Sequence, residues 1–227
     1  MKLIVFYNFN DNNFGPIKTV LNLIQSLLKN NNLFYLSGII LYLISISSCK
    51  KFDCVNVGNK MNEFTAMEWI NGMNQSIKKL NGKVVLIRWW SDDCIYCINS
   101  SEALNEWHLK YQNENFQILG IYHVKPIERI VNKEEIQEFT REKGFQFPIG
   151  IDKDWMNLKN YWLGCEEKDF TSFSILLDKT GKIRYIHNGG SYFKDNDETN
   201  TTVDNEIIRS EKDYNTIDSL IQKLLVE

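Results

Sequence analysis

Two cysteines stand three positions apart in the stretch "WWSDDCIYC", which covers residues 89 to 97. The pair, Cys94 and Cys97, could be a redox couple, half of a metal site, or two thiols without chemistry. It directly follows the apolar run Val84–Ile87 and directly precedes a helix-like stretch. Because the thiolate is the attacking species and a free cysteine has a pKa of about 8.5, a reactive pair needs surroundings that favour the anion.

The start of a helix provides such surroundings. Its unpaired backbone N–H groups and the helix dipole favour a negative charge, so we expect Cys94 to be the nucleophile that attacks a substrate disulfide. Cys97 lies one turn further on and is expected to resolve the mixed disulfide by attacking Cys94. A redox couple is therefore favoured over a static disulfide or an inert pair.

The remaining cysteines and histidines do not complete a metal site. Structural zinc normally needs a second close cysteine pair or histidines at ligand spacing, whereas the three histidines are scattered along the chain. No metal is therefore expected. Cys54 and Cys165 remain as single cysteines; we expect Cys165 to be a lone buried cysteine, with a third redox thiol as the alternative. His123 is expected to be a hydrogen-bonded structural histidine at a strand end.

The first part of the chain is expected to be an export signal. Leu33–Ser48 carries no charge over about 16 residues, fewer than the roughly 20 that a helix needs to cross a bilayer. The run ends in "ISSC", which resembles the lipobox of bacterial lipoproteins, so Cys49 is the expected lipidation site. Residues 1–48 would then be a lipoprotein-type signal peptide, 49–63 a tether and 64–227 the folded domain. The alternative is an uncleaved signal anchor.

Composition limits the size of the fold and the class of partner. The 227 residues, 43% of them hydrophobic, can bury one core but not two large ones. The formal charge of −3 is small and evenly spread, which argues against a nucleic-acid partner. In an exported chain cysteines tend toward disulfides, and lone thiols are scarce.

Strands and helices that alternate along the chain must position the cysteine pair. A continuous apolar run predicts a strand covered on both faces at 83–90, and a helix follows from about Cys94 to Tyr111. The rest of the pattern predicts a strand, a helix, a short strand leading to a helix, a strand–turn–strand hairpin and a closing amphipathic helix, at 116–124, 132–144, 145–162, 172–190 and 213–227. This order is typical of an α/β layer fold.

With this order of elements, "GKVVLIRWWSDDCIYC" resembles the active-site signature of thioredoxin-like proteins. It is similar, more narrowly, to exported TlpA/DipZ-like thiol-disulfide oxidoreductases of the AhpC/TSA-Redoxin type. The segments "EWINGMNQSIKKLNGKVVLI", "FQILGIYHVKP" and "ILLDKTGKIRYIHNGG" are also similar to their counterparts there, and the resemblance covers roughly residues 64 to 226.

The resemblance implies a thioredoxin-like fold, with a central mixed β-sheet flanked by helices. It also implies a membrane-anchored, extracytoplasmic enzyme that exchanges thiols and disulfides with protein clients. A membrane electron donor would feed it, and no organic cofactor would be required. Trp90 and Tyr96 are expected to flank the site.

Two departures from the family pattern act on the thiols. Asp93 replaces the tryptophan that usually precedes the first cysteine; with Asp92 beside it, it should raise the pKa of the neighbouring thiol. Arg88 stands where thioredoxins carry a buried acid; it cannot accept a proton, but it would favour a thiolate if it pointed toward the pair. Because these effects oppose each other, their net direction does not follow from the sequence.

A third departure is Ser172, which stands where the family has a cis-proline that faces the cysteine pair. A cis bond before a residue other than proline costs about 3 kcal/mol, so we expect a trans peptide and a remodelled groove. The serine could donate a hydrogen bond, or it could let a metal or cluster reach the thiols. In the active-site helix Glu102 replaces a frequent proline, which predicts a straight helix.

Two other functions remain as alternatives. A peroxiredoxin-type peroxidase has the same fold, but it needs a threonine three residues before its reactive cysteine, and Ser91 stands there. A binding or scaffold module that has lost redox turnover is the stronger alternative, because Arg88, Asp93 and Ser172 all depart from the family pattern.

Overall fold

The computed structural model describes residues 52–165, 168–194 and 205–227. The predicted signal peptide, residues 1–48, and the predicted lipidation site Cys49 lie outside the described residues. Within the described parts of the chain, no helix combines the length and the apolar composition that crossing a bilayer requires.

One mixed sheet of six strands lies at the centre of the described domain, as the α/β prediction requires. The strand order is β1-β4-β3-β2-β5-β6. Strand β2 pairs in parallel with β3 and antiparallel with β5, and all of its residues are buried, as predicted for a strand covered on both faces. The strands are β1 (Glu68–Ile70), β2 (Val84–Trp90), β3 (Phe116–Tyr122), β4 (Ile149–Ile151), β5 (Ser174–Leu177) and β6 (Ile183–His187).

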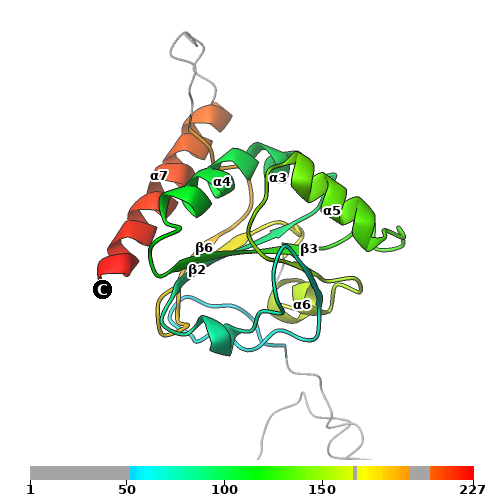
Figure 1. Ribbon diagram of the computed structural model, residues 1–227, viewed down its shortest axis with the longest axis horizontal. Helices are drawn as coiled ribbons and strands as arrows, with labels where there is room; N and C mark the ends of the chain where they lie inside the picture. Colours follow the sequence, from blue (N-terminus) through cyan, green and yellow to red (C-terminus); the bar gives the residue numbers. More distant parts are fainter. Residues whose placement is uncertain (1–51, 166–167, 195–204) are drawn as a thin grey trace, which may run out of the picture. The chain divides into compact units, whose positions relative to one another are not determined.

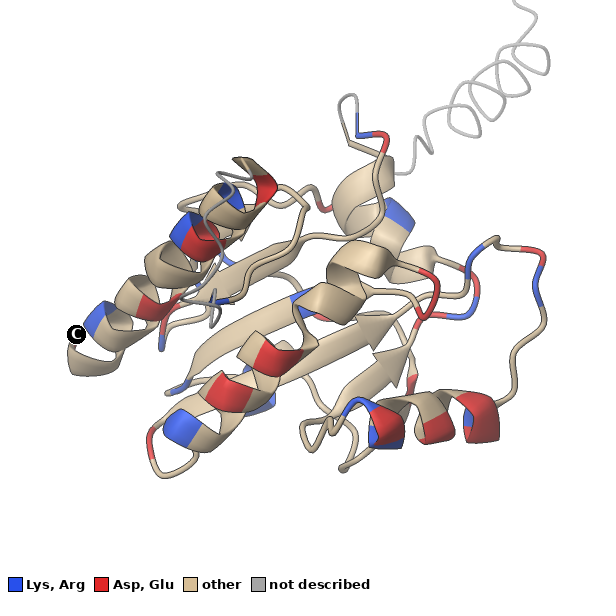
Figure 2. Cartoon of the chain, turned by 90° about the horizontal axis from the view of Figure 1, so that it is seen from above, with Lys and Arg blue, Asp and Glu red and all other residues tan. Residues whose placement is uncertain are grey.

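Helices cover both faces of this sheet. Helices α3, α4, α5 and α7 lie on one face, and α6 lies on the other (Figure 1). Basic and acidic residues are interspersed along α7, which ends at the C-terminus (Figure 2). The helices are α3 (Ile95–Asn99), α4 (Ser101–Lys110), α5 (Lys133–Glu142), α6 (Met156–Leu158) and α7 (Asn205–Val226), with a 3₁₀ helix η1 (Ile77–Leu80) and a π-helix η2 (Lys159–Leu163).

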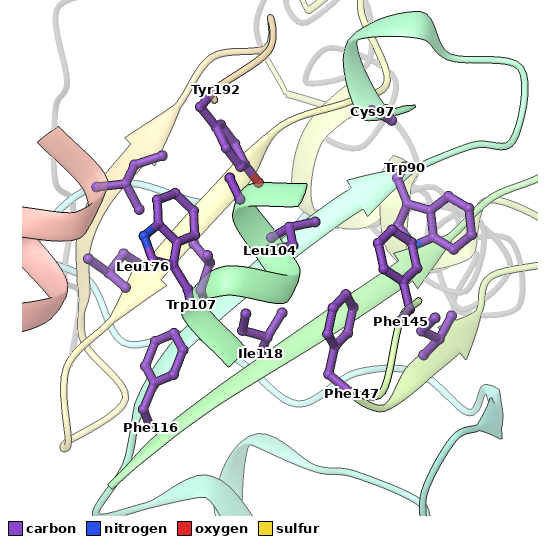
Figure 3. Close-up of a cluster of buried hydrophobic side chains, with 14 of the residues drawn as sticks. Trp90, Cys97, Leu104, Trp107, Phe116, Ile118, Phe145, Phe147, Leu176 and Tyr192 are labelled. Carbon is purple, nitrogen blue, oxygen red and sulfur yellow. The ribbon is translucent and has the colours of Figure 1, made fainter. Parts of the chain in front are cut away.

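Side-chain alternation along β2 divides the core into two layers, because neighbouring residues of a strand point to opposite faces. Trp90 packs in the layer shared with α4, where it lies near Phe145 and Phe147 (Figure 3). Trp89 packs in the opposite layer, stacked on Phe173 with ring centroids 4.5 Å apart. Arg88 therefore belongs to the Trp90 face, which is the face that carries Cys97.

The helix predicted from Cys94 to Tyr111 is interrupted, so the expectation of a straight helix is wrong. Helix α3 ends at Asn99, and α4 begins at Ser101. The buried Ser100 hydroxyl donates a 2.7 Å hydrogen bond to the Tyr96 carbonyl oxygen and accepts a 3.1 Å bond from the N–H of Tyr192. A serine that bonds back to the preceding turn bends a helix, so Ser100, and not the residue at 102, determines this break.

A disulfide joins Cys54 to Cys165, with Cα atoms 5.7 Å apart and a sequence separation of 111. The prediction that each is a single cysteine is therefore wrong. The described part of the predicted tether, 49–63, also makes backbone hydrogen bonds with the domain, from Val55 to Tyr161, from Gly58 to Ile183 and from Met61 to Gly181. This pairing could not be predicted from the sequence, because nothing local to either cysteine indicates its distant partner.

Candidate redox-active site

The cysteine pair lies at the junction between the end of β2 and the start of α3. Cys94 is the N-cap of α3, and its Sγ accepts a 3.3 Å hydrogen bond from the backbone N–H of Cys97. The two cysteines form a disulfide, with Cα atoms 5.2 Å apart. Cys94 is partly exposed, whereas Cys97 is only 5% exposed. One sulfur can therefore meet a partner molecule while the other is shielded by the protein.

Ser172 contacts both sulfurs. Its Oγ lies 3.3 Å from Cys94 Sγ and 3.1 Å from Cys97 Sγ. Because neither sulfur of a disulfide carries a proton, the serine hydroxyl is the donor in this state. Its peptide bond is trans, since the only cis bond among the described residues precedes Pro126. The geometry matches the hydrogen-bonding alternative for this position.

A metal needs several ligands that converge on one point. Within the described ranges, no group of three or more His, Cys, Asp and Glu side chains lies close enough together to hold an ion. Among these residues, no further protein ligand is therefore in place for a metal that would bind the thiols beside Ser172.

Arg88 points from β2 into the protein, directly beneath the pair. It is 1% exposed, and its Nη2 lies 3.7 Å from Cys97 Sγ and 3.2 Å from the carbonyl oxygen of Gly190. Nη1 lies 3.3 Å from the Ser174 hydroxyl, and the guanidinium carbon lies 5.1 Å from the ring centre of Tyr192. Burial lowers the pKa of Arg88, because the charged form loses its hydration.

The two carboxylates that precede Cys94 are both engaged. Arg129 binds the Asp92 carboxylate with two hydrogen bonds, of 2.9 and 2.7 Å, and the Tyr122 hydroxyl donates a third at 3.2 Å. Asp93 accepts a 2.6 Å hydrogen bond from Ser91. Burial and the nearby Asp92 raise the pKa of Tyr122, so its hydroxyl stays protonated and donates. The two negative charges are therefore less free to oppose a thiolate than the sequence suggests.

A groove of about 890 Å³ opens beside the exposed sulfur. Its walls include Cys94, Tyr96, Ser172, Trp155 and Phe170. Tyr96 is 46% exposed at its rim. Trp90, in contrast, is buried in the core and stacks on Phe139, with ring centroids 5.6 Å apart. It supports the strand that carries the site without lining the groove.

His123 is fully buried, and neither ring nitrogen has a hydrogen-bond partner among the described residues. The expectation of a hydrogen-bonded histidine is therefore wrong, although its ring packs edge-on against Trp155 at 5.6 Å, as a structural residue would. Burial, with Lys125 and Arg88 nearby, lowers the pKa of His123 to about 3. The imidazole is neutral near pH 7 and is not an acid for the thiols there.

Sequence reasoning missed three contacts of the site. Arg129, the partner of Asp92, is 37 residues away in sequence, and Gly190, which holds Arg88, is 102 residues away. Tyr192 completes the surroundings of the guanidinium from a segment after β6. Gly190 ends a segment that resembles the family, but nothing local to any of the three residues indicates its contact, so only the folded chain brings them to the site.

Comparisons with known proteins agree with this geometry. The model of the AhpC/TSA family matches residues 57–186. Protein DipZ of Mycobacterium tuberculosis (strain CDC 1551 / Oshkosh) is 25% identical over 164 residues, which cover 69% of this chain but only 19% of DipZ. The matched region is thus about a fifth of the length of that relative.

Two shorter relatives are matched over most of their length. The thiol-disulfide oxidoreductase YkuV of Bacillus subtilis (strain 168) is 27% identical over 126 residues, 56% of this chain and 80% of YkuV. The thiol-disulfide oxidoreductase ResA of Geobacillus thermodenitrificans (strain NG80-2) is 26% identical over 148 residues, 65% of this chain and 78% of ResA.

Solved structures show the same fold. A thiol-disulfide isomerase from Corynebacterium glutamicum superposes with a TM-score of 0.53 and 22% identity, over 75% of this chain and 97% of the other. A thioredoxin-like protein in the oxidized form superposes with a TM-score of 0.51 and 23% identity, over 70% of this chain and 88% of the other. These likenesses confirm the predicted thioredoxin-like fold.

Proposed function

The chain belongs to the AhpC/TSA family, and from this premise we propose that it is a thiol-disulfide oxidoreductase that works through Cys94 and Cys97. The observation that carries the proposal is the arrangement of the pair, a disulfide at the first turn of α3 with one sulfur at a groove and the other buried. The names of YkuV and ResA support the same chemistry.

In the reducing direction, the Cys94 thiolate attacks a client disulfide. A Cys94–client disulfide forms, and one client sulfur leaves as a thiolate that takes a proton from water. The Cys97 thiolate then attacks Cys94 Sγ, closes the Cys94–Cys97 disulfide and expels the second client sulfur. The client gains two electrons, which the cysteine pair loses. The two sulfurs carry these electrons themselves, so we propose that no organic cofactor takes part.

Different groups serve the two sulfurs in this scheme. Ser172 and the N–H of Cys97 both lie within hydrogen-bond distance of Cys94 Sγ, and such donors stabilise a thiolate. The groove beside Cys94 would receive an extended client segment, with Tyr96 at its rim. Protein dithiols and disulfides are therefore the proposed substrates, and nucleic acid is not a proposed partner.

We propose further that the domain acts outside the cytoplasm, at a membrane surface. The Cys54–Cys165 disulfide supports an oxidising compartment, because such bonds are rare in chains that stay in the cytosol. Residues 1–48 would direct export, acyl chains on Cys49 would anchor the chain, and a membrane protein would supply electrons. Labelling cells with radioactive palmitate tests the anchor: label on the wild type that Cys49→Ala abolishes supports it, and equal label on both contradicts it.

Insulin reduction with dithiothreitol as electron source, together with exchange against a glutathione buffer, tests the activity. We expect turnover that is lost in Cys94→Ala and in Cys97→Ala. The matched control is the Cys54→Ala/Cys165→Ala double variant, which removes the other disulfide and should keep turnover. Absence of exchange in the folded wild type would favour the scaffold alternative, and peroxide consumption that depends on Cys94 would favour the peroxidase.

A further inference from the structure

Arg88 is a buried cation without a carboxylate partner among the described residues. Its hydrogen-bond partners are the Ser174 hydroxyl, the Gly190 carbonyl oxygen and the sulfur of Cys97, all of them uncharged while the disulfide is closed. Its Nε has no acceptor in the described part of the chain. A charge that is removed from water and left without a counter-ion destabilises the state that contains it.

The ionisable groups that face Arg88 from the neighbouring segments are neutral at pH 7. Burial raises the pKa of Tyr192, so its phenol stays protonated. Burial lowers the pKa of His187 on β6, so its imidazole is neutral. The Nε2 atom of His187 lies 3.0 Å from an Asp213 oxygen, so the Asp213 carboxylate is engaged by this histidine. His123 on the β3 side is neutral, as described above. No neighbour therefore neutralises the guanidinium in the oxidised protein.

Reduction changes this situation at one atom. Opening the disulfide makes Cys97 Sγ able to carry a negative charge, and that atom lies 3.7 Å from Nη2 of Arg88. A charge pair at this separation, shielded from water, is held together far more strongly than at the surface. Cys94, with its donors Ser172 and the Cys97 N–H, does not contact Arg88.

We propose that Arg88 is the counter-ion of the Cys97 thiolate, and that it thereby shifts the Cys94–Cys97 couple toward its reduced form. The inference rests on the proposed oxidoreductase function and deepens it. In balanced form, the oxidised pair takes two electrons from a client dithiol, or from the electron donor, and one proton. It becomes a Cys97 thiolate and a Cys94 thiol, and the Cys94 thiol loses its proton to water before it attacks a client disulfide as described above.

Two consequences follow for the reaction. The oxidised protein becomes a better electron acceptor, because accepting electrons provides the buried cation with its missing anion. In the mixed disulfide, Cys97 is already a thiolate and attacks Cys94 without transferring a proton to a base. Arg88 is thus a positioning residue that acts through Cys97, in the place where thioredoxins carry an acid.

Three single variants of the full chain test this proposal. Arg88→Met removes the charge at similar length, Arg88→Lys retains it, and Arg184→Met removes a charge from the outer strand β6 as the matched control. In the reduced proteins, the ¹³Cβ chemical shift of Cys97 is followed against pH. We expect a pKa below the ordinary cysteine value in the wild type, a higher one in Arg88→Met, an intermediate one in Arg88→Lys and no change in Arg184→Met.

Equilibrium with glutathione gives a second measurement. We expect Arg88→Met to favour the oxidised protein at least tenfold more than the wild type does, which is about 30 mV for a two-electron couple. The wild-type equilibrium should also change about tenfold per pH unit between the pKa of Cys97 and about pH 8, because reduction takes up one proton where glutathione oxidation releases two. The pH dependence needs no variant, and the Cys97 titration of the wild type shows which sulfur is ionised, so the inference can be tested even if Arg88→Met does not fold.

Two outcomes would overturn the inference. One is a wild-type Cys97 that titrates at the ordinary cysteine pKa. The other is an unchanged Cys97 pKa in a folded Arg88→Met. Failure of the proposed function is distinct from both: the disulfide would then not exchange with glutathione at all, while the Cys97 titration in the chemically reduced protein would still decide the role of Arg88.

Discussion

Two disulfides among the described residues have opposite surroundings. Cys94–Cys97 joins residues 3 apart, and Cys54–Cys165 joins residues 111 apart. Hydrogen-bond donors surround the first bond, whereas Cys165 Sγ lies 3.9 Å from a carbonyl oxygen, that of Asn160, which offers no stabilisation to an anion. The surroundings of Cys94–Cys97 would therefore stabilise the anion that forms when that bond opens, and those of Cys165 would not.

The two disulfides also differ in the length of the chain loop that each one closes. In the chain-entropy account, a disulfide stabilises a fold by restricting the unfolded chain, and the gain grows with the loop it closes, reaching about 4.7 kcal/mol for 100 residues. A three-residue loop restricts the unfolded chain little by comparison. Breaking Cys94–Cys97 therefore costs the fold little, so this bond can open and close during a reaction.

Removing a cysteine of the close pair tests the difference between the two disulfides, and we expect it to have the largest effect. We expect Cys94→Ala to lower the rate of insulin reduction by roughly a hundredfold or more, because no attacking thiolate remains. Cys97→Ala should instead accumulate a mixed disulfide with the client, visible by mass spectrometry. The fold should survive in both variants, as judged by circular dichroism. A Cys94→Ala protein with half the wild-type rate would contradict the assignment.

The next test removes the long-range bond. We expect Cys54→Ala/Cys165→Ala to lose about 3 to 5 kcal/mol of unfolding free energy, measured by urea denaturation, because the unfolded chain regains its freedom. Insulin reduction should stay within about twofold of the wild-type rate at a temperature where the variant is folded. A tenfold loss of rate in the folded variant would make Cys54–Cys165 part of the redox chemistry and would remove the distinction between the two bonds.

A smaller effect is expected from the donor at the exposed sulfur. Ser172→Ala removes a hydroxyl that lies 3.3 Å from Cys94 Sγ, so the pKa of the Cys94 thiol should rise and its alkylation at pH 7 should slow roughly tenfold. Ser172→Thr retains the hydroxyl and should recover most of the rate. The pH dependence of alkylation by iodoacetamide, followed at the Cys94 peptide, measures both. Equal rates in all three proteins would show that the serine does not act on the thiolate.

The smallest expected effect concerns the surface ion pair next to the site. Arg129→Met releases the Asp92 carboxylate near Cys94, so the pKa of that thiol should rise slightly and its alkylation should slow about two- to threefold at low salt. Because this pair is partly exposed, the difference should shrink at high ionic strength. An effect as large as that of Ser172→Ala would mean that the acidic loop, and not the serine, governs the exposed sulfur.

Much of the fold could be predicted because its signals are local. The buried strand β2, the start of α3 at the cysteine pair and the amphipathic closing helix follow from hydrophobic period and spacing. The break at Ser100 was not predicted, because a serine in a helix pattern does not show whether its hydroxyl will bond back to the preceding turn, as Ser100 does to the Tyr96 carbonyl oxygen.

The candidate site divides in the same way. By itself, the sequence determined that two cysteines one helical turn apart would meet, since that geometry lies within a single turn. Only the tertiary structure decided what surrounds them: that Arg88 reaches Cys97, that Ser172 contacts both sulfurs, that Arg129 holds Asp92, and that Cys54 meets Cys165. The physical reason is that three of these contacts join residues 37 to 111 positions apart, and that Arg88 and Cys97, nine positions apart, lie on a strand and a helix whose packing sets their distance.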